Sequence, residues 1–339
     1  MSKSLGNVIN PQDITRGGFD TNKDPPYGVD VLRWWVASHG LQHSTTTISK
    51  RLLDECAENI KRLRNTLKFL VGSIADFPPE SVVEPPVPST LDNYFLLQLL
   101  DFQAKVDQSY ESFQLNRVCS SINNFVANDL SSFYCHITKD RLYCDGSRSE
   151  RRKSTQYAMF HALNILTKSF APIMPILAEE LYSYHPHKTD ESKPYFFEFD
   201  RIPPLQLKLD SREISQLKSC FVLALDLKKE VAAEIPVNLK STEVGVVIRA
   251  DSSSYELLRM LQIEDVSFYS DLVAILQVSH VRLEKDESAC RYSVDVRVAD
   301  YELCARCRKC CVPRASDSDV CSRCDDVLDL CPTLDVSSV

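Results

Sequence analysis

The feature that most limits the fold of this chain is a long series of apolar residues at three- and four-residue spacing between residues 50 and 182. Residues spaced in this way share one face of an α-helix. The clearest stretch covers residues 50–74, with an apolar face formed by Leu53, Cys56, Ile60, Leu63, Leu67, Leu70 and Ile74. Apolar faces this long must be buried against one another, so the pattern predicts a helix bundle. Only 8 of the 339 residues are glycine, which favours a mostly helical chain.

The remaining patterns predict the elements on either side of this stretch. We expect helices over residues 27–38, 91–113, 115–133, 157–182 and 211–233, with a break at Ala171–Pro175. Proline-rich connectors cover residues 76–90 and 186–210. After residue 240 the spacing changes to two, which predicts strands at Val244–Ile248, Val278–Leu283 and Tyr292–Val298, with a helix near Leu257–Leu261. The fold class expected is therefore mainly α: a helix bundle followed by a small α+β domain and, after residue 300, a short cysteine-rich ribbon.

The net charge of −8 excludes a uniformly basic coat for nucleic acid, so any RNA contact must come from local basic patches. One candidate patch is the polar face of the helix over 50–74, which carries Lys61, Arg62, Arg64 and Lys68. A second is a polar loop predicted over 139–153, which carries Arg141, Arg148, Arg151, Arg152 and Lys153, with Tyr143 as a ring for base stacking. From composition alone, a solvated surface explains both patches equally well.

Seven of the 13 cysteines lie between Cys304 and Cys331. Cys304-Ala-Arg-Cys307 and Cys321-Ser-Arg-Cys324 are separated by thirteen residues, and two such pairs suit tetrahedral zinc. Cys307 and Cys310 form a further C-x-x-C pair, but the Cys-x-Arg-Cys symmetry favours Cys304, Cys307, Cys321 and Cys324 as ligands. Arg306, Arg308, Lys309, Arg314 and Arg323 surround them and could reach an RNA backbone. No secretory signal is visible, and no apolar run is long enough to span a membrane.

The first residues place Lys3 between Ser2 and Ser4, with Gly6-Asn7 close behind. A lysine among small residues suits contact with a phosphate. The stretch from Ser2 to Ile14 resembles the KMSKS signature loop of class I aminoacyl-tRNA synthetases. Met1 would be the methionine of that motif, whose first lysine would lie one residue upstream.

Further stretches narrow the resemblance. They are Val31-Leu32-Arg33-Trp34-Trp35, Leu130–Tyr134 with Lys139–Tyr143, Phe170–Pro175, and the terminal zinc ribbon, together with Lys23–Gly28, which looks most like the animal mitochondrial enzymes. Together they resemble mitochondrial-type isoleucyl-tRNA synthetases, with this chain as a C-terminal fragment beginning inside the motif. Valyl and leucyl enzymes, the alternative, share the Val31–Trp35 stretch but lack this ribbon.

The resemblance implies ATP-dependent activation of isoleucine, with Mg²⁺, and its transfer to tRNA-Ile. Lys3 would be catalytic, and Ser2, Lys3 and Ser4 would contact ATP. The two basic patches would contact tRNA, and one structural zinc would sit in the ribbon. The full-length enzyme would be a monomer of the mitochondrial matrix, with the cytoplasm as the alternative. The fragment alone would be inactive, because it lacks the HIGH-type loop, the nucleotide fold and the editing domain.

The resemblance also sets expected domain bounds. Residues 1–48 would end the catalytic domain, 49–204 would form the helical anticodon-binding domain, 205–300 the small α+β domain, and 301–339 the ribbon and tail. A second class of function stays open, namely a stand-alone RNA-binding zinc-ribbon protein without catalysis.

Overall fold

The computed structural model describes residues 9–18, 25–40, 48–83, 85–186, 204–314, 316 and 318–330. The chain divides into two compact units, each assembled from separate stretches of sequence. Unit 1 is formed by Met1–Val83, Leu97–Phe133 and Gln156–Leu205, and unit 2 by Glu84–Leu96, Tyr134–Thr155 and Gln206–Val339. Three elements contribute residues to both: α5 (Thr90–Glu111), the π-helical segment η2 (Phe125–Cys135) and α8 (Glu150–Phe170).

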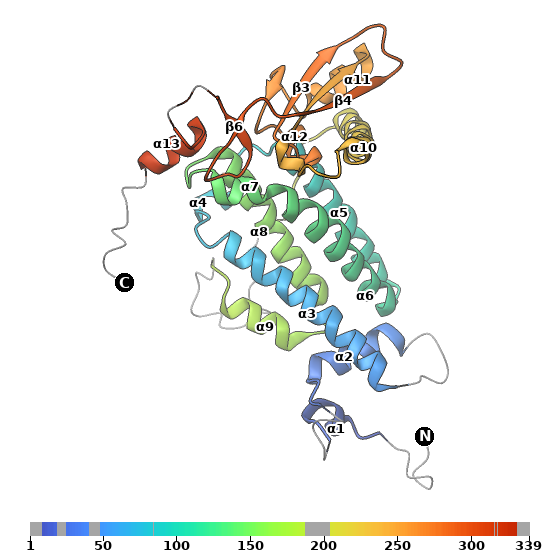
Figure 1. Cartoon of the computed structure of the whole chain (residues 1–339). Helices are drawn as coiled ribbons and strands as arrows, with labels where there is room; N and C mark the ends of the chain where they lie inside the picture. Colours follow the sequence, from blue (N-terminus) through green and yellow to red (C-terminus); the bar gives the residue numbers. More distant parts are fainter. Residues whose placement is uncertain are drawn as a thin grey trace, which may run out of the picture. The chain divides into compact units, whose positions relative to one another are not determined.

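Within unit 1 the helices form a bundle (Figure 1). Besides its parts of α5, η2 and α8, it contains α1 (Pro11–Arg16), α2 (Val29–His39), α3 (Lys50–Ser73), α4 (Glu80–Val83), α6 (Leu115–Asn124) and α9 (Pro175–Ser183). The predicted helix over 50–74 is confirmed as α3, which begins where the Ser49 side chain accepts a hydrogen bond from the Leu52 amide at 3.4 Å. Among the described residues no helix is both long and apolar enough to cross a membrane.

The predicted break after Phe170 is also confirmed, and α2 is fixed against it. Helix α8 ends at Phe170 and α9 starts at Pro175. Arg33 of α2 donates hydrogen bonds to the carbonyl oxygens of Ile173 and Pro172, at 2.7 and 2.9 Å. The Asp30 carboxylate accepts from the Leu177 amide at 2.8 Å. A carboxylate is favourable there because the first turn of a helix has unpaired N–H groups.

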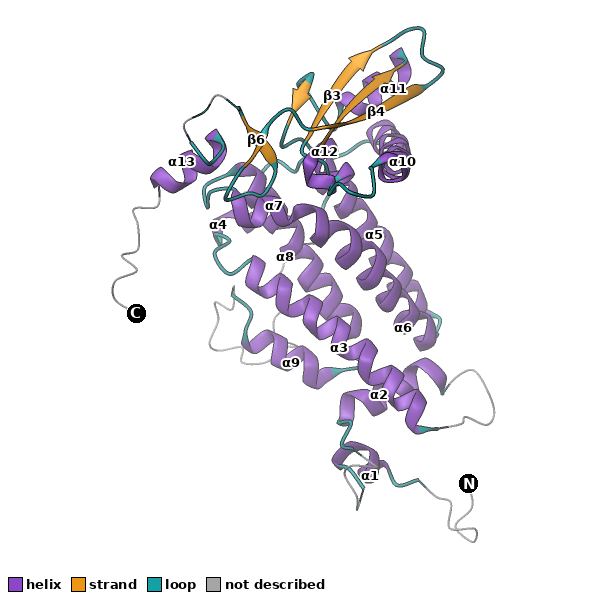
Figure 2. Ribbon diagram, in the orientation of Figure 1, coloured by secondary structure: helices purple, strands orange, loops and turns teal. Residues whose placement is uncertain are grey.

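Unit 2 holds the strands of the described chain (Figure 2). Besides its parts of α5, η2 and α8, it contains α7 (His136–Cys144), α10 (Ser211–Glu234), η4 (Ser241–Glu243), β1 (Val244–Ala250), α11 (Ser252–Arg259), β2 (Val266–Ser267), α12 (Asp271–Leu276), β3 (His280–Lys285), β4 (Tyr292–Val298), β5 (Glu302–Leu303), β6 (Cys310–Val312) and α13 (Ser322–Leu330). The main sheet has the order β2-β3-β1-β4, and β5 pairs with β6 in a separate two-stranded sheet.

The three predicted strands are confirmed as β1, β3 and β4, but their pairing was not foreseen. Strand β1 runs parallel to β3 and antiparallel to β4. A parallel pair needs a crossover, and α11, β2 and α12 lie within it. Gly245 of β1 lies opposite His280 of β3, and a Cβ at Gly245 would come within 2.1 Å of the imidazole ring. A side chain at position 245 would therefore force the His280 ring to move.

A buried arginine organises the centre of unit 2. Arg141 of α7 is 1% exposed and lies between two carboxylates. Its Nη1 is 3.3 Å from Asp92 Oδ1 at the start of α5, and its Nη2 pairs with Asp271 at the start of α12. Asp92 also accepts a hydrogen bond from the Tyr134 hydroxyl at 2.6 Å. The network links three helices through charged groups that are removed from water.

Candidate functional site

The residues predicted to face ATP, namely Ser2, Lys3 and Ser4, lie outside the described residues, as does Cys331. The roles assigned to Ser2, Lys3 and Ser4 stay predictions.

The basic face predicted on α3 is exposed. It consists of Lys61, Arg62, Arg64 and Lys68. Lys61 Nζ lies 3.3 Å from a carboxylate oxygen of Glu58, one turn earlier. Arg64 pairs with Glu180 of α9. Exposed pairs of this kind contribute little to stability, so an incoming phosphate can compete for these cations.

An exposed aromatic residue beside this face was missed by the sequence analysis. Tyr184 follows α9 and is 72% exposed. It lines a groove together with Arg64 and Lys68. An open ring beside two cations suits single-stranded RNA, because bases can stack while phosphates are neutralised. Tyr184 lies beyond the last apolar position of α9, so the helical spacing gave no signal for it.

The polar loop predicted over 139–153 was wrong as a loop. Helix α7 continues to Cys144 and α8 begins at Glu150, so only residues 145–149 form a turn. Arg148 is exposed in this turn, and Tyr143, in the last turn of α7, is 64% exposed. The short turn therefore presents one cation and one aromatic ring to solvent.

The prediction that Arg141 contacts RNA does not fit the folded chain. Its side chain is 1% exposed and pairs with Asp92 and Asp271. A guanidinium that already neutralises two buried carboxylates cannot reach a phosphate. Arg141 lies on α7, but residues 139–153 were predicted to form a loop. Because no helix was expected there, the burial of Arg141 was missed.

The other cations of this region are half-buried and engaged. Arg151 Nε is 3.1 Å from Asp145, and the Arg151 guanidinium also donates to the Tyr269 carbonyl. Arg152 Nε donates to the Leu142 carbonyl at 3.2 Å. Lys153 Nζ is 3.0 Å from an exposed carboxylate one turn earlier. Arg148 is consequently the most available of the cations predicted here.

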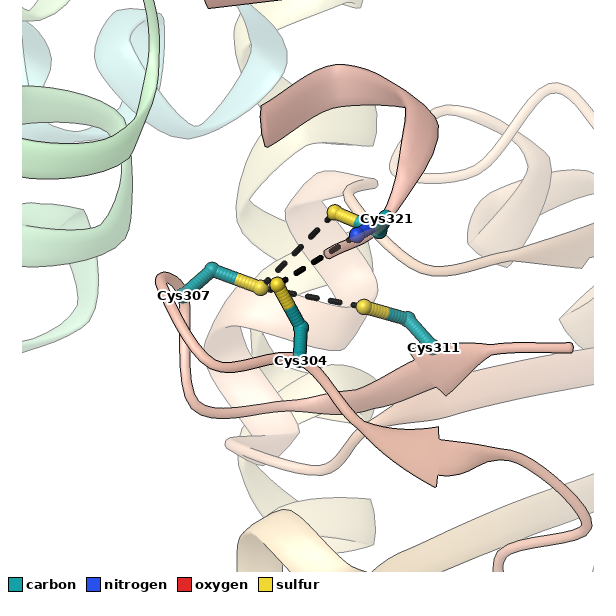
Figure 3. A group of neighbouring side chains, drawn as sticks. All are labelled: Cys304, Cys307, Cys311 and Cys321. Carbon is teal, nitrogen blue, oxygen red and sulfur yellow. Dashed lines mark hydrogen bonds between the residues drawn. The ribbon is translucent and has the colours of Figure 1, made fainter. Parts of the chain in front are cut away.

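Four cysteine thiols gather in the C-terminal ribbon (Figure 3). The sulfur atoms of Cys304, Cys307, Cys311 and Cys321 all lie within 4.8 Å of one another. Cys307 Sγ is 3.7 Å from Cys311 Sγ and 4.0 Å from Cys321 Sγ. Four sulfurs at 2.3 Å from a tetrahedral zinc would be about 3.8 Å apart. The cluster therefore has the donors and the size for a zinc ion.

This set differs from the predicted one in its fourth member. Cys304, Cys307 and Cys321 are shared, but the structure gathers Cys311 where the spacing indicated Cys324. Strand β6 pairs with β5, and this pairing brings Cys311 close to Cys304 and Cys307. Cys324 is also fully buried, and Arg306 Nη1 lies 3.5 Å from its sulfur.

The environment of Cys304 favours the thiolate, the form that binds metals. Burial acts to raise the pKa of the Cys304 thiol. The backbone N–H groups of Cys307, Cys321 and Arg306 outweigh burial and lower the pKa to about 6.

Comparison with known proteins gives a family for part of the chain. Residues 92–236 match a family described as the anticodon-binding domain of tRNA ligase. This range covers all but the first two residues of α5, and α6 to α10, of the described structure.

Relatives extend the match over most of the chain. The mitochondrial isoleucine–tRNA ligase of Mus musculus is 35% identical over 300 residues, which are 88% of this chain and 29% of the mouse protein. The isoleucine–tRNA ligase of Microcystis aeruginosa is 33% identical over 332 residues, covering 91% of this chain and 34% of the relative. That of Thermosynechococcus vestitus is 41% identical over 191 residues, covering 56% of this chain and 20% of the relative. The chain thus spans about a third or less of the length of these relatives.

Proposed function

Because mitochondrial and bacterial isoleucine–tRNA ligases are homologues of this chain over most of its length, we propose that it is the tRNA-Ile-binding part of an isoleucine–tRNA ligase. The observation that carries the proposal is the anticodon-binding domain over 92–236. The complete enzyme would activate isoleucine with ATP and Mg²⁺ and transfer it to tRNA-Ile. Lys3, flanked by Ser2 and Ser4, would stabilise the pyrophosphate that leaves in the first step.

We assign the complete enzyme to the mitochondrial matrix. We propose that the domains of this chain meet near residues 49, 205 and 301.

The RNA would lie against those predicted contact residues that the fold leaves exposed. These are Lys61, Arg62, Arg64 and Lys68 on α3, and Arg148 in the turn before α8. The net charge of −8 makes such local patches the attractive part of the surface. Tyr184 and Tyr143 offer rings on which unpaired bases can stack.

The proposal is tested by binding an anticodon stem-loop of tRNA-Ile to the full chain across a range of salt concentrations. Lys61→Ala should weaken binding and make the negative slope of log K against log salt shallower by about 0.7 to 0.9, the value for one phosphate contact. Lys229→Ala on α10 is the matched control. Both lysines lie 3.3 Å from a carboxylate three residues away, and their side chains are 67% and 80% exposed. Equal effects of the two substitutions, or no binding by the wild type, would refute the proposed interface.

We also propose that the ribbon holds one structural zinc ion through Cys304, Cys307 and Cys321 and a fourth thiolate. Spacing favours Cys324 as the fourth ligand, and the geometry favours Cys311. The ion would join the two cysteine pairs of this small segment, so folding of the ribbon would depend on it. Zinc content by mass spectrometry in Cys311→Ser and Cys324→Ser identifies the fourth ligand, because only loss of a true ligand releases the metal.

A further inference from the structure

The first cysteine pair of the ribbon contains an arginine that binds the end of α7. Arg306 lies between Cys304 and Cys307. Its Nη1 donates to the carbonyl of Cys144 at 2.6 Å, and its Nη2 to the carbonyl of Tyr143 at 3.3 Å. The last carbonyls of a helix have no partner within the helix. Arg306 supplies these hydrogen bonds and places a positive charge at the negative end of α7.

The second cysteine pair contains an arginine that binds the same helix from its side. Arg323 lies between Cys321 and Cys324, and its Nη1 and Nη2 donate to the two carboxylate oxygens of Asp140, at 2.8 and 3.0 Å. Nη1 also donates to Asp145, at 2.9 Å. A paired contact of this kind fixes orientation as well as distance.

The contact between Arg323 and Asp140 is shielded from water. The side chain of Arg323 is 15% exposed, and its guanidinium carbon lies 4.1 Å from the centre of the Tyr269 ring. Burial acts to raise the pKa of Asp140, but the hydrogen bonds from Arg323 and the nearby positive charges outweigh it and lower the pKa. A partly desolvated ion pair holds its partners more firmly than an exposed one.

What these arginines fix is the segment that presents Tyr143 and Arg148. Tyr143 belongs to the last turn of α7, and Asp145 begins the turn that carries Arg148. The side chains of Tyr143 and Arg148 are both exposed. From the sequence, Arg306 and Arg323 were expected to be able to reach an RNA backbone, but in the structure their guanidinium groups bind α7 and Asp145.

We propose that Arg306 and Arg323 are positioning residues for RNA. They hold the end of α7 and the 145–149 turn, so that the Tyr143 ring stacks on an unpaired base and Arg148 meets a phosphate. The inference rests on the proposed function, since it concerns how the same RNA is held. It also gives the ribbon a role: the metal orders the two cysteine pairs, and through their arginines it orders an RNA-contact segment.

The test is a double-mutant cycle between Arg323→Gln and Tyr143→Ala, measured as affinity of the full chain for the anticodon stem-loop. Tyr143→Ala should weaken binding about tenfold, as loss of one stacked base does. Arg323→Gln should weaken binding to a similar extent in the wild-type background. In the Tyr143→Ala background its further effect should fall clearly below its effect alone, because the ring it positions is already gone.

Hydrogen exchange without RNA supplies the structural readout. Amides of residues 143–149 should exchange faster in Arg323→Gln and in Arg306→Gln, while zinc content stays at one equivalent. Arg314→Gln, which changes an exposed arginine of the same ribbon, is the matched control and should leave this exchange unchanged. If Arg323→Gln does not fold, Arg306→Gln carries the cycle, since it reaches the same helix end from the other cysteine pair.

The outcomes separate this inference from the proposed function. Equal effects of Arg323→Gln in both backgrounds would mean that Arg323 contacts RNA itself or acts elsewhere, and would overturn the inference alone. Unchanged exchange in residues 143–149 would overturn it as well. If the wild-type chain does not bind the RNA, the proposed function fails and the RNA part of the inference fails with it, whatever the exchange shows.

Discussion

Replacing Arg141 by methionine should severely destabilise unit 2. The substitution keeps a long apolar side chain in α7 but removes the charge between Asp92 and Asp271. Asp92 is 0% exposed, and the Asp271 side chain is 10% exposed. Both carboxylates would then lose the cation that pairs with them while staying largely cut off from water.

The expected magnitude follows from the cost of an uncompensated buried charge. Removing one partner of a buried ion pair costs about 3–5 kcal/mol. Asp92 keeps its hydrogen bonds from Tyr134 and Ser89, so the effect should not exceed this range. For a unit of 150–250 residues, about 2–4 °C of melting temperature is lost per kcal/mol. We therefore expect the transition of unit 2 to fall by about 6–20 °C.

The assay is urea and thermal unfolding followed by circular dichroism. Arg148→Met is the matched control, because Arg148 is an exposed arginine seven positions away and should change stability by less than about 0.5 kcal/mol. Combining Arg141→Met with Asp92→Asn and Asp271→Asn should recover much of the loss, since no net charge is then buried. The Asn side chain can still accept the hydrogen bond that Asp271 receives from the Leu91 amide at 2.8 Å.

A loss below about 1 kcal/mol in Arg141→Met would show that water reaches the guanidinium, and the buried network would be wrong. RNA binding offers a second check at a temperature where the variant is folded. Arg141→Met should keep the wild-type dependence of affinity on salt, because a buried cation releases no counterion. A reduced slope would restore Arg141 as an RNA contact.

Three further predictions concern other parts of the chain. His161 lies among aromatic rings, and burial lowers its pKa from 6.5 to about 4. Between these pH values it is neutral in the folded chain and protonated in the unfolded chain, so stability should be highest above pH 6.5 and fall by up to about 3 kcal/mol as the pH drops to 4. In urea titrations, His161→Phe should remove this dependence on pH. Cys304→Ser should release zinc and unfold the ribbon while the helical bundle melts as before, whereas retention of a full equivalent of zinc would exclude the proposed centre. The 339-residue polypeptide by itself should give background isoleucine-dependent exchange of pyrophosphate into ATP, because its described residues contain no nucleotide-binding fold, and clear exchange would contradict this.

Local patterns in the sequence determined most of the helical architecture. The three- and four-residue spacing from Leu53 to Ile74 encodes one buried face, and a face of that length can only be a helix. Pro172 and Pro175 have no backbone N–H to donate, so they separate α8 from α9 whatever the rest of the fold is. The alternation from Val244 to Ile248 puts every second side chain on one face, which is the pattern of a strand.

Tertiary structure alone decided which chemical groups meet. The parallel pairing of β1 with β3 depends on a crossover, which no local pattern records. Arg141 and Arg148 look alike in the sequence, yet one neutralises carboxylates that are 49 and 130 residues away and the other faces solvent. Cys311 joins the thiol cluster because β6 folds back on β5, whereas spacing had pointed to Cys324. Spacing along the chain fixes the direction of a side chain relative to its own helix or strand, but its charge partners come from segments whose approach depends on the packing of the whole unit.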